Sequence, residues 1–302
     1  MVRLGLAMAI VAASAPAYAW SAQGHMASGA IAFDQLAAND AAAIDAIRRL
    51  MAAHPERARF DASLADLAGP ARDRMLFELM ARWPDDVRRT QFDHPGWHQE
   101  LRVVSGWHIF APLQFGEAER AFRRNLAIVR DMRANPAERA VAACWLLHLI
   151  GDMHQPLHAG HRISMRFPGS DRAGTIAWVR HAADRPPVSL HVFWDRAADL
   201  PGPDTAAAAT IAREAEAIVK PDAVASSDGT AEAQFHDWTV ESETLAATVA
   251  YQGAGLTASA RREDAPVVSA PYVVGARRLA ERRLGEAGIR IARLLENLFP
   301  AS

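Results

Sequence analysis

The sequence is poor in cysteine, lysine and net charge, and each shortage excludes a class of protein. Its 302 residues include a single cysteine, Cys144, so an intrachain disulfide framework is excluded. Every Lys or Arg position except Lys220 is arginine, and 33 Lys+Arg against 35 Asp+Glu leave a formal net charge of −2. Gripping duplex DNA through a broad cationic face needs many net positive contacts, because counterion release drives that binding. The composition argues against that class.

Long apolar runs are also missing, apart from one short run at the N-terminus. Residues 4–13 are apolar and follow a basic start, but the run is too short to span a bilayer. Ala17-Tyr18-Ala19 then supplies the small-x-small pattern that signal peptidase reads. We therefore expect residues 1–19 to be a signal peptide cleaved before Trp20, with export to the periplasm or the medium and no membrane span in the mature chain.

Apolar residues at helical spacing fill most of the remaining chain. Half of all residues are hydrophobic, and a charged fraction of 23% with 11 Phe and 8 Trp excludes a disordered chain. Residues 20–302 show no solenoid repeat and no clear linker, so we expect one all-α domain, and a monomer. The expected helices cover residues 26–37, 40–53, 72–82, 117–133, 137–153, 203–219, 231–252 and 271–298.

Two segments depart from this simple pattern. Between residues 159 and 190, glycines and Pro186-Pro187 predict a long irregular loop or a small hairpin, and long ordered loops are often functional. The last helix, 271–298, carries Arg283, Glu286 and Arg290 among apolar residues. The simplest interpretation of its arginine-rich side is a solvated face.

Histidine is abundant, with twelve in the chain, and some lie at spacings that suit a metal. His148 and Asp152 are four residues apart on the expected 137–153 helix, so they share one face. Pro156 must end that helix, and His158 follows just after the break.

A second pair, His191 and Asp195 in Leu-His-Val-Phe-Trp-Asp, repeats the same spacing. Imidazole with carboxylate is the ligand set that zinc takes where thiolates are absent. Either pair alone is equally well explained by histidines satisfied in a core or a cap. Two pairs in one exported chain favour a metal site.

Three upstream motifs join these pairs: Trp20-Ser-Ala-Gln-Gly24-His25, Ala81-Arg-Trp83-Pro-Asp85-Asp-Val-Arg88 and Ser105-Gly-Trp107-His108. The ordered set from Trp20 to Asp195 resembles the zinc-dependent single-strand-specific nucleases of the mung bean nuclease type, in the phospholipase C/nuclease superfamily. Trp-Thr-Val-Glu-Ser at 238–242 and the segment 287–297 also resemble that family.

The resemblance implies three zinc ions. It assigns one to Asp85, His108, His148 and Asp152. It assigns a second to the Trp20 amine and carbonyl, His25 and the other Asp152 oxygen, and a third to His158, His191 and Asp195. Asp85 would also orient the attacking water, and Arg88 would hold Asp85 or a phosphate oxygen bidentately.

A metal cluster also suits phosphodiester chemistry, because it activates water, neutralises phosphate oxygens and stabilises the leaving alkoxide. The resemblance implies hydrolysis of single-stranded DNA or RNA at the P–O3′ bond, which leaves 5′-phosphates. It also makes 3′-nucleotides a second expected substrate.

Some positions depart from the family pattern. An aromatic residue and an aspartate that contact a base are replaced by Ile109 and Ala111, and the loop motif Asp171-Arg-Ala-Gly174-Thr175 lacks an asparagine. Both differences concern substrate contacts and leave the zinc ligands intact. Cys144 is expected to pack in the core, and the histidines without a place in the pattern to cap or lie at the surface: His54, His94, His98, His154 and His161.

Two other functions stay open on the sequence alone. A zinc-dependent phospholipase C of the same superfamily would share His148, Asp152 and His158. The short gap from Trp20 to His25, and Asp195 where those lipases have Glu, favour the nuclease. A non-catalytic periplasmic zinc-binding protein would instead carry its histidines in a flexible tract, whereas here the ligands come from separate places in the chain.

Overall fold

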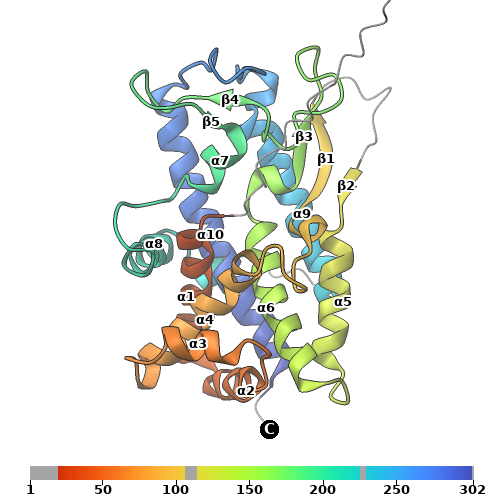
Figure 1. Cartoon of the computed structure of the whole chain (residues 1–302), viewed down its shortest axis with the longest axis vertical. Coiled ribbons are helices and arrows are strands. Elements are labelled where there is room, and N and C mark those ends of the chain that lie inside the picture. Colours follow the sequence, from red (N-terminus) through yellow and green to blue (C-terminus); the bar gives the residue numbers. More distant parts are fainter. Residues whose placement is uncertain (1–19, 106–113, 225–228, 301–302) are drawn as a thin grey trace, which may run out of the picture.

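The computed structural model describes residues 20–105, 114–224 and 229–300, which are mostly helical (Figure 1). The helices are α1 (Ala22–Asn39), α2 (Ala41–Met51), α3 (Arg57–Ser63), α4 (Gly69–Asp86), α5 (Ala118–Arg130), α6 (Pro136–Asp152), α7 (Leu190–Asp195), α8 (Asp204–Ile218), α9 (Ala231–Leu245) and α10 (Ala270–Leu298). Each of the eight expected helices corresponds to one of these, so the all-α prediction is confirmed. None of the described helices is long and apolar enough to cross a membrane.

Side-chain caps explain several helix starts. Asn135 accepts a hydrogen bond from the Ala137 amide, with Pro136 in the first turn of α6. Ser21 caps α1, so this helix begins four residues before the expected start and already contains His25. The α4 helix runs through Pro84 to Asp86, which places Asp85 in its last turn.

Two short helices and the end of α9 were not expected. With seven and six residues, α3 and α7 are too short to show an apolar period. The expected helix 231–252 is α-helical only to Leu245 and continues as a π-helical turn over Ala246–Ala250.

A small sheet aligns two segments that matter for the site. It has the order β2-β1-β3, where β1 is Glu100–Ser105, β2 is Gln114–Gly116 and β3 is Gly160–Arg162. The β1 and β3 strands pair in parallel, with Arg102 opposite Gly160. Between residues 159 and 190 the chain also forms an antiparallel hairpin of β4 (Trp178–Val179) and β5 (Val188–Ser189), so the expectation of a hairpin there is confirmed.

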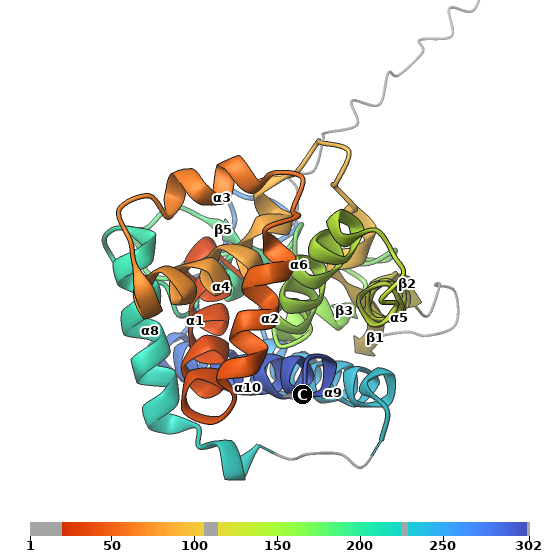
Figure 2. The same ribbon diagram turned by 90° about the horizontal axis from the view of Figure 1, so that it is seen from below.

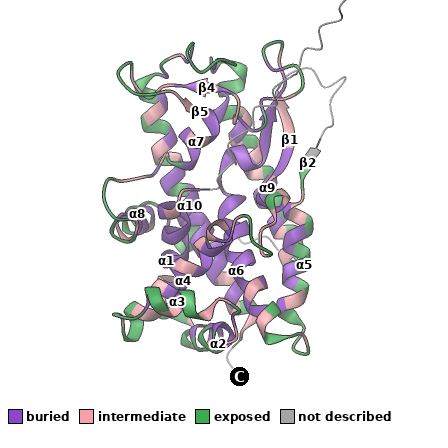
Figure 3. Cartoon of the chain, in the orientation of Figure 1, coloured by how far each residue is buried: buried purple, intermediate pink, exposed green. Residues whose placement is uncertain are grey.

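The helices pack as a bundle around α1, α4 and α6. Seen from below, α8 covers one side of this centre and α5 the other, while α9 and α10 lie along a third (Figure 2). Almost every residue of α6 is buried (Figure 3). Cys144 lies in this core, as expected. Two glycines allow close helix contacts: a Cβ at Gly29 would lie 2.5 Å from the Phe77 carbonyl oxygen, and one at Gly288 would lie 2.5 Å from the Ile31 Cβ.

The expectation that the arginine side of α10 is a solvated face is wrong. Arg283, Glu286 and Arg290 are only 3%, 7% and 5% exposed. They are buried because α9 packs beside α10 and supplies Glu241, which pairs with both arginines. An apolar period alone does not show that a second helix covers the charged side.

Candidate metal centre

Histidines and aspartates from six helical elements converge at one end of α6. His25 comes from α1 and Asp85 from the last turn of α4. His148 and Asp152 lie one turn apart on α6. His98 ends a 3-10 turn over Pro95–His98, His158 ends another over Pro156–His158, and α7 supplies His191 and Asp195.

Asp152 is the centre of this convergence and is fully buried. Its Oδ2 lies 3.2 Å from His148 Nε2 and 3.1 Å from His98 Nδ1. Its Oδ1 lies 3.4 Å from His25 Nε2 and 3.8 Å from His158 Nδ1. Both oxygens of one carboxylate therefore face ring nitrogens from separate elements.

The ligand atoms fall into three groups, each able to hold a metal ion: His25, Asp85 and His148; His98, His148 and Asp152; and His158, His191 and Asp195. Within each group the atoms lie within 4.8 Å of one another. In the third group, Asp195 Oδ1 is 3.8 Å from the Nε2 atoms of both histidines. These separations approach the ligand–ligand edge of about 3.3 Å that a tetrahedral zinc site has with bonds of about 2 Å.

Backbone carbonyls orient the histidine rings. The Nδ1 of His148 is hydrogen-bonded to the Ala81 carbonyl at 2.8 Å, and that of His191 to the Ala173 carbonyl at 2.8 Å. His158 Nδ1 is bonded in the same way to the His98 carbonyl, which the parallel pairing of β1 and β3 brings alongside. An Nδ1–H that donates to a carbonyl leaves Nε2 as a free lone pair, the arrangement that metal-binding histidines use.

Several buried polar atoms of the site have no hydrogen-bond partner within the described part of the chain. They are both ring nitrogens of His25, Nε2 of His98 and of His158, Oδ1 of Asp152 and Oδ2 of Asp195. Leaving such atoms unsatisfied is costly, and a bound ion is a standard explanation. The donor set, imidazole and carboxylate without thiolate, fits zinc.

The protonation of the site also suits a cation. Burial lowers the pKa of His25 to about 4, so its imidazole is neutral near pH 7. The Asp152 pKa lies well below its usual value because His148 and His158 outweigh the effect of burial. Burial raises the pKa of Asp195 well above its usual value, and repulsion from the nearby Asp152 and Asp85 raises it further. A bound cation would stabilise that carboxylate as the anion.

Glycines within the motifs allow close packing against the site residues. A Cβ at Gly24 would lie 2.9 Å from the Trp20 Cβ, and one at Gly151 would lie 3.0 Å from His25 Nδ1. Gly174, with φ +79°, packs against the His191 amide. The glycines of Gly-His, His-x-x-Gly-Asp and the 171–175 loop thus each border a different part of the centre.

Trp20 lies beside the site. It is 1% exposed and borders a cavity of about 590 Å³ together with Asp85 and Asp195. Its Nε1 donates to the Gly151 carbonyl at 2.9 Å, and the next amide, that of Ser21, donates to the Asp195 carbonyl at 3.0 Å.

Arg88 contacts Asp85, one of the two arrangements that the resemblance implied. Its Nε and Nη2 both donate to Asp85 Oδ1, at 3.1 and 2.5 Å. Asp85 is thereby fixed at the edge of the cavity.

The sequence analysis missed two residues of the centre. His98 lies beside Asp152 and His148, in the place that the resemblance assigns to His108, which falls outside the described residues. Trp97-His98 and Trp107-His108 are both Trp-His pairs after Asp85, so the motif alone did not separate them. The second is Gln155, whose Nε2 donates to Asp195 Oδ1 at 2.7 Å. The remaining unassigned histidines at 54, 154 and 161 are buried and do not lie at the surface. His54 and His154 do bond backbone groups at helix ends, the Glu56 amide and the Ile150 carbonyl, as capping residues would.

Comparison with known proteins agrees with this geometry. The model of the S1/P1 nuclease family matches residues 20–300, which include every described residue of the centre. No curated protein matches the chain. Since the family match covers nearly the whole sequence, the chain belongs to the S1/P1 nuclease family.

Proposed function

We propose that this hydrolase is a three-zinc phosphodiesterase that cuts single-stranded DNA or RNA at the P–O3′ bond and leaves 5′-phosphates. In this proposal 3′-nucleotides are a second substrate. The observation that carries it is the trio of His/Asp groups around the buried Asp152, in a chain of a nuclease family.

The chain's own residues would each have a defined part. Zinc ions, when bound, would supply the positive charge that activates water and stabilises the phosphate and the leaving oxygen. Asp152 presents an oxygen to each side. Ring nitrogens are presented by His25, His98, His148, His158 and His191.

Asp85 is the residue best placed to accept a proton from the attacking water. Arg88 holds its Oδ1, while Oδ2 remains directed toward His25 Nε2, at 3.9 Å. The pKa of Asp85 is lowered in spite of burial by His148, His25, His98 and Arg88, so this carboxylate is ionised near pH 7.

We also propose that the protein acts as an exported monomer whose N-terminus is Trp20. The family match begins at Trp20, and the buried place of this residue beside Asp85 and Asp195 supports a role for its free amine as a ligand. His108 remains a proposed ligand from the resemblance, and His98 is added to it from the geometry.

The test is a digest of single-stranded RNA and DNA by the zinc-loaded chain 20–302, with end-group analysis. We expect oligonucleotides with 5′-phosphates, and loss of activity after chelation. Phosphatidylcholine is offered in parallel. Release of phosphocholine without nucleic-acid cleavage would identify a phospholipase C, and full zinc occupancy without turnover of any phosphoester would identify a zinc-binding protein.

A further inference from the structure

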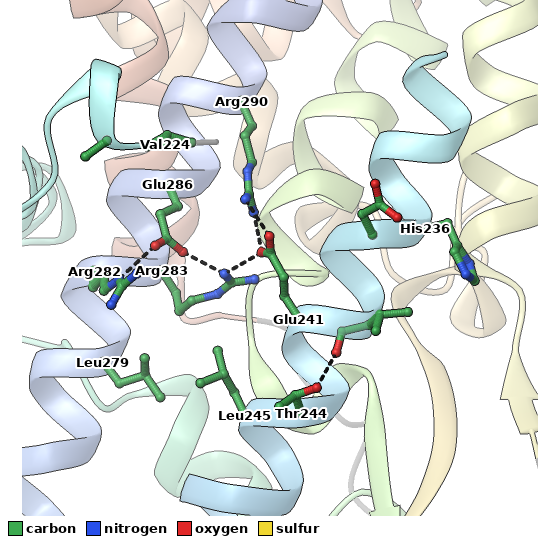
Figure 4. A pocket seen from close by; sticks show the side chains of 13 residues that line it. Val224, His236, Glu241, Thr244, Leu245, Leu279, Arg282, Arg283, Glu286 and Arg290 are labelled. Atoms are coloured by element: carbon green, nitrogen blue, oxygen red, sulfur yellow. Dashed lines mark hydrogen bonds and ion pairs between the residues drawn. The ribbon is translucent and has the colours of Figure 1, made fainter. Parts of the chain in front are cut away.

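The buried arginines of α10 form a charged network with α9. Arg290 donates to both oxygens of Glu241, at 2.7 and 2.8 Å, and Arg283 donates to Glu241 at 2.9 Å and to Glu286 at 2.6 Å (Figure 4). Glu241 belongs to the Trp-Thr-Val-Glu-Ser motif, which the metal centre does not use. The network therefore joins two sequence motifs that have no assigned role.

This network holds the turn that follows α6. Arg283 Nε donates to the His154 carbonyl at 3.3 Å, and Arg290 Nη1 lies 2.7 Å from His154 Nε2. Arg283 Nη2 donates to Ser242 Oγ at 3.0 Å, and Ser242 in turn donates to the Met153 carbonyl at 2.6 Å. Residues 153 and 154 are thus held by side chains from both α9 and α10.

The same turn connects the metal groups. Asp152 comes immediately before it, Gln155 comes immediately after it and donates to Asp195, and His158 follows in the next turn. Close packing of Gly288 on Ile31 also fixes α10 against α1, the helix of His25. A shift of the turn would therefore move Asp152 and His158, which belong to two of the three groups, relative to the other ligands.

A general contribution to stability does not require charges here. Burial of ion pairs is costly, and apolar residues of similar volume often stabilise a fold as well or better. Burial lowers the pKa of Arg283 from its ordinary value, which shows that cost. What charged hydrogen bonds supply is direction, because guanidinium groups fix carbonyl and carboxylate partners in a defined geometry.

We propose that Glu241, Ser242, Arg283 and Arg290 are positioning residues that fix the turn at 153–154, so that Asp152 and Gln155 are placed for metal binding. This inference rests on the proposed function, since it concerns the same metal centre. Residues that support metal ligands from outside typically contribute 10- to 100-fold to metal affinity or activity.

Glu241→Gln tests this directly, since it keeps the shape and removes the charge that both arginines share. The network borders a cavity of about 670 Å³ between α9 and α10. The isosteric glutamine therefore does not have to fit into a closed core. We expect at least tenfold weaker zinc binding by the apoprotein, measured by calorimetric titration and metal analysis. In the loaded enzyme, kcat should fall at least tenfold while KM stays within about twofold.

Glu281→Gln is the matched control. Glu281 lies on α10 and, unlike the part-exposed Glu241 of α9, is buried. It too pairs with an arginine, Arg277, at 2.7 Å, but within the described part of the chain it makes no hydrogen bond to the 153–154 turn. Its zinc affinity and kcat should equal those of the wild type, even if both variants lose stability. Equal losses in the two variants, or wild-type affinity in Glu241→Gln, would overturn the proposal.

Ser242→Ala decides the question if Glu241→Gln does not fold. This variant removes only the hydroxyl that joins Arg283 to the Met153 carbonyl. It too should bind zinc more weakly, and wild-type affinity would overturn the proposal. Failure of the wild-type chain itself to bind zinc would instead contradict the proposed function, so the two failures are distinguishable.

Discussion

At the scale of single residues, Asp152 has the most connections in the centre. Its two oxygens face ring nitrogens of four histidines from separate elements, and none of the carboxylate is exposed. Such a residue is expected to bind two ions at once, because one oxygen is directed to each side. The neighbouring Gly151 leaves space for the His25 ring, since any side chain there would press on it.

Asp152→Asn should remove metal and activity together. The amide keeps the size of the side chain but loses the charge and one acceptor, so neither side retains a full ligand set. We expect fewer than three zinc ions per chain by metal analysis. The fall in kcat should exceed the roughly hundredfold limit typical of residues outside the first ligand layer. Near-normal turnover with full zinc content would show that Asp152 does not bridge the ions.

A second prediction concerns His54, which is buried and packs edge-on against Phe60 and Trp83. Burial lowers its pKa to about 4, and its Nδ1 accepts a hydrogen bond from the Glu56 amide. The unfolded chain binds a proton at this residue below about pH 6.5, whereas the folded chain does so only near pH 4. The free energy of unfolding should therefore fall as the pH drops from 6.5 to 4, by up to about 1.4 kcal/mol per pH unit for this group.

Because glutamine does not titrate, the free energy of unfolding of His54→Gln should depend less steeply on pH. The slope should be smaller by up to about 1.4 kcal/mol per pH unit, which corresponds to one proton. The measurement is urea unfolding of the metal-free protein at pH 4.5, 5.5 and 6.5, so that zinc does not contribute. The same pH dependence in wild type and variant would show that the pKa of His54 is the same in the folded and the unfolded chain.

At the scale of elements, the sequence predicted the segments with a repeating apolar pattern and missed the elements without one. Long helices such as α6 and α10 show several apolar turns, so their existence and approximate limits could be read directly. The six residues of α7 form less than two turns, and β1 pairs with β3 across more than fifty residues, so neither leaves a local pattern. The two Trp-His pairs show the same limit at the site. The His98 carbonyl lies beside His158 next to the pairing of β1 with β3, a contact that no local pattern predicts.

The contact of α10 with α1 gives an element-level prediction. At Gly288 an added Cβ would lie 2.5 Å from the Ile31 Cβ and 2.9 Å from the Ser28 carbonyl oxygen, so the helices must separate in Gly288→Ala. Overpacking of this kind costs about 1–3 kcal/mol. We expect a lower free energy of unfolding in urea, and weaker zinc binding because α1 carries His25.

Gly275→Ala on the same helix is the control. A Cβ there has nothing within 4 Å, and alanine in an exposed helix interior is favoured by about 1 kcal/mol over glycine. This variant should be slightly more stable, with unchanged zinc affinity. If Gly288→Ala were equally stabilised, α1 and α10 would not be in the close contact described.

At the scale of the whole molecule, the shortage of lysine and the near-zero net charge have a structural counterpart. Within residues 20–105, 114–224 and 229–300, four arginines are buried: Arg139, Arg162, Arg283 and Arg290. Buried pairing favours the planar guanidinium over the compact ammonium group. In the proposed enzyme, the charge that attracts phosphate comes from three Zn²⁺, six positive charges against the aspartates Asp85, Asp152 and Asp195. The composition excludes a grip on duplex DNA but not this local attraction.

The identity of the mature N-terminus decides whether that cluster is complete. The proposed second ion takes the amine of Trp20, which exists only after cleavage before this residue. The precursor 1–302 should therefore bind about one zinc less per chain than the chain 20–302 and be nearly inactive. A chain that begins at Ala19 is the sharper comparison, because one extra residue blocks the amine without the bulk of the whole leader. It should share the precursor's deficit in metal analysis, whereas equal zinc content and activity in all three chains would show that Trp20 is a packing residue and that His25, Asp85, Asp152 and His148 suffice.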